Sequence, residues 1–360
     1  MNWLLLFIPI TLLLEHFGVK PTLLFFSAAI AIVPIAAMIV HATEQVASRT
    51  GEAVGGLLNA TFGNAPELII CLVALKAGYL EMVRAALIGG ILANLLLAMG
   101  ASFFLGGLRH HQQNFNANAA RLYSSTMLLA VVSMAIPSAF SRAFAPEGVV
   151  REEQMLNIGI AVTLLLAYGL YLLFSLKTHP EAFASASVSG GVETEGHGHG
   201  GKVWSLQRAI GSLVGASLLA AWMSEILVGA AEGTGKALGM SEVFIGVVFL
   251  AVIGGAAESG SAITVARRNR MDLAVGIALG SCIQIALFLA PVLVLASYFV
   301  SPQPLELSFS RAELGALGFG VLVGAFVIND GQSNWFKGVQ LMTLYAFIAM
   351  MFYFIPEITA

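Results

Sequence analysis

The chain has 360 residues, of which 58% are hydrophobic and only 10% are charged. Soluble domains carry about 25% charged residues, so this composition excludes an ordinary soluble enzyme or a nucleic-acid-binding protein and indicates an integral membrane protein. The formal net charge of -3 is uninformative, because membrane helices are oriented by the positions of Lys and Arg and not by their sum.

Apolar segments of about the length that crosses the hydrocarbon core as a helix recur eleven times. In chain order they are Trp3–Leu14, Leu23–Val40, Val54–Leu75, Ala85–Leu105, Leu122–Phe140, Met155–Leu176, Ala209–Ala231, Val243–Val265, Leu273–Val300, Ala312–Ile328 and Trp335–Phe354. The first is short and is followed by Glu15 and His16. Because it has neither a basic leader nor a small-residue cleavage site, we expect an accessory membrane helix that is retained.

The most polar interruption, residues 178–203, separates six of these segments from five. It is rich in Gly and Ser, which predicts a flexible linker. Its EGHGHGG tip contains Glu195, His197 and His199, a combination that can hold a divalent metal weakly. We favour the solvated linker, because two His and the nearby acids have no rigid frame.

The two halves on either side of the linker resemble each other. With an offset of 191 residues, five of thirteen positions are identical: Gly55, Ala60, Gly63, Ala65 and Glu67 fall on Gly246, Ala251, Gly254, Ala256 and Glu258. With an offset of 190, Gly90 and Asn94 fall on Gly280 and Gln284.

An odd number of helices in each half makes the second copy enter the membrane from the opposite face. The sequence therefore predicts an all-α membrane fold with an N-terminal helix (residues 1–20) and two inverted five-helix repeats (21–177 and 204–360), joined by the linker. This architecture is typical of secondary transporters, whose binding sites lie near the membrane midplane between the repeats.

Glu67 and Glu258 place one carboxylate in each half within an otherwise apolar segment. An ionised carboxylate in hydrocarbon costs several kcal/mol or more, so such residues mark ion or proton handling. The alternative, a Gly-rich surface for close packing of helices, explains some of the glycines but not the acids. Two acids at matching positions predict one shared cation site.

The residues around the acids suit such a site. Pro66 has no N–H, so the carbonyl of Phe62 loses its helical partner, while Gly63 and the Gly254–Gly255 pair let the backbone bend. Ca²⁺ takes six to eight oxygens, and two glutamates supply at most four. Freed carbonyls, Asn64, Ser281 or water would have to supply the rest.

Several stretches resemble the cation/proton exchanger family of calcium/cation antiporters: HATEQVASRTGEAVGGLLNATFGNAPELI, GGILANLLLAMG, SEVFIGVVFLAVIGGAAES, ARRNRMDLAVGIALGSCIQIALFLAPVLV and DGQSNWFKG. The resemblance covers nearly the whole chain. It implies that Glu67 and Glu258 bind Ca²⁺ and protons in alternation. It also implies that the polar path is lined by Asn64, Asn94, Ser281 and Gln284, and that the linker takes the place of an acidic loop or helix.

The second motif departs from the family pattern, which usually reads GNAAEH where this chain has GGAAES. Gly255 and Ser259 therefore replace an amide and an imidazole, which leaves the preferred cation open. Glu44 and Glu225 occupy related places near the ends of two segments and, with Ser259, are candidates for a gate or proton relay, with simple interfacial placement as the alternative.

The predicted function is antiport of Ca²⁺, or a similar divalent cation, against protons by alternating access. A Na⁺-coupled exchanger is the nearest alternative, and a passive channel or an intramembrane hydrolase is the alternative from another class. We expect no enzyme activity and no cofactor besides the transported Ca²⁺ and H⁺. The expected partners are the lipid bilayer and the transported cations, with no nucleic acid, and the sequence leaves the oligomeric state open. With eleven spans, ten of the 17 Lys and Arg residues lie on the same face of the membrane as the N-terminus, and seven lie on the other face. Because cytoplasmic loops carry an excess of Lys and Arg, this favours a cytoplasmic N-terminus in a prokaryotic inner membrane.

Overall fold

In this computed structural model, residues 2–49, 55, 57–58, 61–144, 150–183 and 204–355 are described. The first half contains η1 (Asn2–Leu6), α1 (Phe7–His16), α2 (Pro21–Ala47), α4 (Ala65–Lys76), α5 (Leu80–Leu92), η2 (Ala93–Ala98), α6 (Met99–His110), β1 (Gln112–Asn114), α7 (Ala117–Phe144), α8 (Val150–Leu173), η4 (Phe174–Thr178) and η5 (Pro180–Ala182). The second contains α9 (Leu206–Leu238), α10 (Glu242–Phe244), η6 (Ile245–Leu250), α11 (Ala251–Gly254), α12 (Ala256–Ala266), α13 (Met271–Gln284), η7 (Ile285–Leu289), α14 (Ala290–Val300), α15 (Arg311–Ile328), β2 (Gln332–Asn334) and α16 (Trp335–Phe354).

Helices dominate, which confirms the predicted all-helical membrane class. The exception is a pair of three-residue strands, β1 and β2, which run antiparallel with Gln112 opposite Asn334. The sequence did not predict this pairing, because the two segments lie far apart in the chain and are polar, so neither shows the apolar alternation of a strand.

Eight described helices are long and apolar enough to cross a membrane, and a ninth span results if α10 to α12 are counted as one bent crossing. The N-terminal apolar helix is shorter, and residues 54, 56, 59 and 60 of the third expected segment lie outside the described residues. The count of eleven spans therefore stays a prediction.

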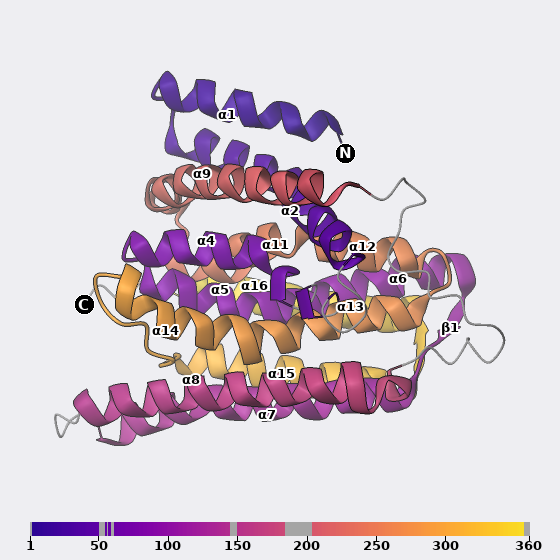
Figure 1. Cartoon of the computed structure of the whole chain (residues 1–360). Coiled ribbons are helices and arrows are strands. Elements are labelled where there is room, and N and C mark those ends of the chain that lie inside the picture. The colour runs from indigo at the N-terminus through magenta and orange to yellow at the C-terminus, as the bar shows by residue number, and fades with distance from the viewer. Residues whose placement is uncertain are drawn as a thin grey trace.

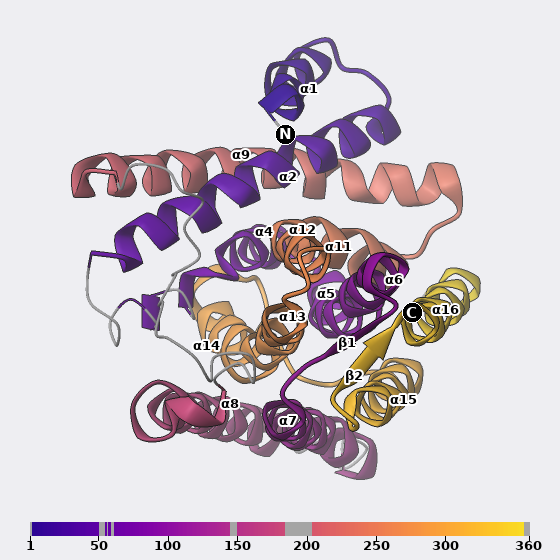
Figure 2. The same ribbon diagram turned by 90° about the vertical axis from the view of Figure 1, so that its right-hand side faces the viewer.

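The centre of the bundle is formed by α4, α5, α11, α12 and α13 (Figure 2). On one face α2 and α9 pack against each other, and α1 lies on α2 (Figure 1). The other sides are covered by α7, α8, α15 and α16. The buried faces of α2 and α9 are rich in Ala, which lets helices approach closely where lipid removes the hydrophobic drive between them.

The loops at the β1 end of the bundle come from both halves. Besides the strand pairing, Gln113 Nε2 donates to the Ala266 carbonyl at 2.9 Å, and Arg121 Nε donates to Asn329 Oδ1 at 3.0 Å. The C-terminus lies at the opposite end (Figure 1). These contacts bring loops of the two halves together at one end of the bundle, and the division into two inverted five-helix repeats stays a prediction.

Candidate cation site

The helix is interrupted just before each of the two acids. In the first half Gly63 and Asn64 form a turn, and α4 begins at Ala65. In the second half Gly255 separates α11 from α12, and the chain bends by 57° between Glu242–Gly254 and Ala256–Ala266. The predicted bends are confirmed. Each acid consequently lies in the first turn of a new helix, where the free N–H groups favour negative charge.

Glu67 is almost completely enclosed, with 7% of its surface exposed, and neither carboxylate oxygen has a hydrogen-bond partner among the described residues. The Oδ1 atom of Asn64 is likewise buried and unpartnered. Buried oxygens without partners are rare because each loses its hydration without replacement. Three such oxygens lie within four residues, an arrangement of hard donors that is able to bind a cation.

The second repeat packs directly on Glu67. A Cβ atom added to Gly254 would lie 2.8 Å from Glu67 Cγ, so only glycine leaves room for this side chain. The Nδ2 atom of Asn64 donates a hydrogen bond to Gln284 on α13. The first acid is therefore held between residues of both halves.

Glu258 is held by α13, where Ser281 donates a hydrogen bond to its Oε2 atom. Ser281 and Gln284 are three residues apart and share a face of this helix. Asn94 lies in η2, a π-helical stretch, with Nδ2 donating to the Gly90 carbonyl at 3.1 Å. Gln284 directly precedes the π-helical η7, so the two positions matched by the internal repeat both adjoin a π-bulge, a feature frequent at functional sites.

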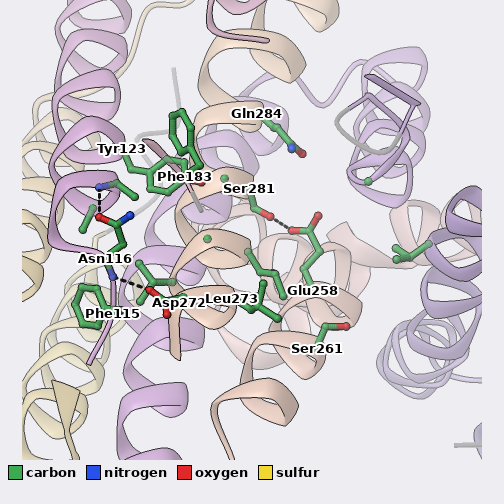
Figure 3. Close-up of a pocket in the computed structure, with 18 of the residues that line it drawn as sticks. Phe115, Asn116, Tyr123, Phe183, Glu258, Ser261, Asp272, Leu273, Ser281 and Gln284 are labelled. Carbon is green, nitrogen blue, oxygen red and sulfur yellow. Dashed lines mark hydrogen bonds between the residues drawn. The ribbon is translucent and has the colours of Figure 1, made fainter. Parts of the chain in front are cut away.

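A cavity of about 300 Å³ leads from the β1 end of the bundle to Glu258. Figure 3 shows the Glu258–Ser281 hydrogen bond on one side of it and the Asn116–Asp272 bond on the other. Predicted residues that line it are Glu44, Gly63, Glu258, Ser281 and Gln284. Glu67 lies beyond these lining residues, so within the described structure the open path ends at the second acid.

Comparison with known proteins decides the family. The sodium/calcium exchanger protein family matches residues 20–177 and 208–354. The chain belongs to this family. The two matched blocks lie on either side of the predicted linker, and the resemblance seen in the sequence is confirmed.

Individual relatives match over nearly the full length. The chain is 41% identical to the Ca(2+)/H(+) antiporter of Aphanothece halophytica, covering 99% of this chain and 96% of the relative. It is 41% identical to the Ca(2+)/H(+) antiporter ChaA of Bacillus subtilis, covering 92% of each. The solved structure of native YfkE shares 37% identity, with a TM-score of 0.82 and 97% of each chain covered.

Sequence reasoning missed the residues at the mouth of the cavity: Asn116, Tyr123, Phe183 and Asp272. Asp272 accepts a hydrogen bond from the Asn116 N–H at 2.6 Å, and the Phe183 ring lies 5.3 Å from that of Tyr123. Phe183 belongs to the stretch predicted as a flexible linker, whose beginning is instead packed against α7. The one available signal was Asp272 in the first turn of a helix.

The remaining residues predicted from the sequence do not all lie at the cavity. Glu44 lines the cavity, whereas Glu225 is 58% exposed and lies 3.5 Å from Lys76. Ser259 donates its backbone N–H to the Gly255 carbonyl at 2.9 Å, and the Phe62 side chain is 41% exposed. Glu195, His197 and His199 lie outside the described residues.

Proposed function

We propose that this chain is a secondary antiporter, and not an enzyme, that exchanges Ca²⁺ or a similar divalent cation for protons. The observation that carries the proposal is the set of three buried, unpartnered oxygens on Asn64 and Glu67, placed beside Gly254 of the other repeat. Two near full-length relatives bear the name Ca(2+)/H(+) antiporter, which supports the same assignment.

Competition for Glu67 and Glu258 explains the exchange. Glu67 is buried and Glu258 is partly buried at the end of the cavity, and two carboxylates in such a weakly polar interior repel each other, so the empty, doubly charged site is unfavourable. Either one divalent cation or protons relieve this repulsion. Neutralisation by either ligand permits the change between the two access states, whereas the empty charged site resists it, and this rule couples the two fluxes. Two protons per Ca²⁺ make the cycle electroneutral, and three add a voltage dependence.

The cavity indicates the side of the membrane to which the proposed site is open in the described conformation. With the N-terminus in the cytoplasm, as the Lys and Arg distribution favours, the β1 end of the bundle faces the cytoplasm. Glu258 is then reached from the cytoplasm through the cavity of about 300 Å³. We assign the protein to the inner membrane of a prokaryote, in a conformation open to the inside.

The test is purified protein in liposomes, with Ca²⁺ uptake followed under imposed proton, sodium or no gradients. We expect uptake against a Ca²⁺ gradient only when a proton gradient drives it. Uptake driven by sodium would replace protons as the coupling ion. Flux that only runs down the Ca²⁺ gradient, independent of either counter-ion, would indicate a passive channel and contradict the proposal.

A further inference from the structure

The two adjacent glycines at the second helix break have different structural roles. At Gly254 an added Cβ would lie 2.8 Å from Glu67 Cγ, a distance that real Cβ atoms do not tolerate, so this glycine is required for packing. At Gly255 an added Cβ would lie 3.4 Å from the Ala251 carbonyl oxygen, which is ordinary van der Waals contact.

Gly255 is not required by its backbone either. Its dihedral angles, φ -76° and ψ 7°, are accessible to any L-residue. The corresponding position of the first repeat, Asn64, has similar angles, φ -93° and ψ 23°, and carries an amide side chain. Neither conformation nor Cβ packing therefore explains the missing side chain at position 255.

Gly255 lies beside Glu67, a proposed cation ligand, and beside the Asn94 amide. A Cβ at this position would lie 3.7 Å from Glu67 Oε1 and 3.7 Å from Asn94 Nδ2. Glu67 Oε1 is buried and has no hydrogen-bond partner among the described residues. The first break thus places an amide oxygen beside the carboxylate, whereas the second offers no side-chain oxygen there.

We propose that Gly255 determines cation selectivity by leaving one coordination position to water instead of a side-chain oxygen. This inference rests on the proposed cation site. A site that keeps a water ligand adapts to ions of different radius, because the water can move while a fixed amide cannot. Ca²⁺ accepts such loose geometry, and the larger Sr²⁺ and Ba²⁺ gain most from the extra room.

The test compares Gly255→Asn with Gly255→Ala. Asn restores an amide at the position equivalent to Asn64, while Ala fills the same space without offering an oxygen. Binding of Ca²⁺, Sr²⁺ and Ba²⁺ chlorides is measured on detergent-purified protein by thermal shift and by titration. We expect Asn to tighten Ca²⁺ binding by about tenfold, within the range that ligand number tunes in Ca²⁺ sites, and to raise the preference for Ca²⁺ over Ba²⁺. Ala should weaken binding of all three ions.

The opposite signs expected for Asn and Ala separate this role from packing. If both variants weaken binding together and lower the unfolding temperature of the cation-free protein, or if both leave the Ca²⁺ to Ba²⁺ ratio unchanged, the inference is wrong. Gly254→Ala is the steric reference and should destabilise the cation-free protein. These measurements need no proton gradient, so protein that binds Ca²⁺ selectively but shows no proton-driven uptake would contradict the proposed antiport alone.

Discussion

At the end of the bundle marked by β1 and β2, a cavity leads inward to Glu258, whereas the opposite end is covered by residues 304–310 between α14 and α15. Leu305, Leu307 and Phe309 are buried, with the residues between them partly exposed, as expected for an extended segment lying on the bundle. We call residues 304–310 the strap. One end of the molecule, which we call the open end, therefore gives access to Glu258, and the strap lies at the other, which we call the closed end.

The strap is held by hydrogen bonds from three helices. Three backbone N–H groups of the strap donate to side-chain oxygens on α14, α8 and α7. Leu305 donates to Ser297 Oγ at 2.8 Å, Leu307 to Asn157 Oδ1 at 2.9 Å, and Phe309 to Ser138 Oγ at 2.8 Å. Non-helical backbone among membrane helices needs such partners, because no lipid atom can replace them. The strap at the closed end is thus held by specific hydrogen bonds, whereas at the open end the cavity reaches Glu258.

The strap also carries a carboxyl group, that of Glu306, which lies near other charged side chains. Burial raises the pKa of the Glu306 carboxyl above its ordinary value, the nearby Glu153 raises it further, and Arg84 opposes both. Arg84 Nη1 donates to the Glu306 backbone carbonyl at 3.3 Å and its Nη2 bonds Glu81. Arg84 therefore ties α5 to the strap beside the acidic side chains of Glu81 and Glu153.

The largest expected effect is at the open end. Glu67→Gln and Glu258→Gln should each abolish proton-driven Ca²⁺ uptake while leaving the unfolding temperature nearly unchanged, since an amide keeps the volume but neither neutralises a cation nor carries a proton. Liposome flux and thermal unfolding measure the two properties separately. Glu15→Gln, the same change on an exposed residue of α1, is the control. Retained proton-driven flux in either folded variant would rule out the two-acid site.

The next effect is at the closed end, and it concerns stability. Asn157→Ala removes the acceptor of the Leu307 N–H and leaves a buried donor unpaired, which should cost about 1–3 kcal/mol and lower the unfolding temperature. Thr163→Ala on the same helix is the control, because that exposed hydroxyl bonds only to the Gly159 carbonyl. An equal unfolding temperature for the two variants would show that the strap is held by apolar packing alone.

A smaller effect is expected where the cavity meets the second acid. Ser281→Ala removes the hydroxyl that donates to Glu258 and should lower the apparent Ca²⁺ affinity about tenfold, equivalent to about 1.4 kcal/mol. Thr264→Ala is the control, because its hydroxyl bonds to the Gly260 carbonyl of its own helix. A transport KM unchanged in Ser281→Ala would place this serine outside the binding site.

The smallest effect is expected from deleting residues 185–200, which lie beyond the packed Phe183. A Gly- and Ser-rich tether supplies no ligand at the membrane midplane, so proton-driven uptake should remain at the level of the intact protein. Uptake per inserted molecule decides the matter. A normally inserted deletion variant without transport would show that this segment takes part in the exchange cycle.

The positions of the two acids could be recognised from the sequence because the cost of burying charge is a property of the residue and its apolar neighbours. Glu67 and Glu258 stand out in this way, and the repeat relating them needs only the order of residues. The bends at Gly63–Asn64 and Gly255 followed from the chemistry of proline and glycine. Apart from the repeat, which compares the two halves, these signals lie within one helix length of the acid concerned.

Tertiary structure alone decided which distant residues meet. The bond between Asn64 and Gln284 and the contact of Glu67 with Gly254 join positions about 190 to 220 residues apart, and no local pattern encodes them. The same holds for Asn116 and Phe183 at the cavity mouth and for the separation of Glu44 from Glu225. Adjacent glycines look alike in a sequence, yet an added Cβ would collide with the Glu67 side chain at Gly254 and make only ordinary contacts at Gly255. Packing between helices, and not residue type, sets the room beside each Cα.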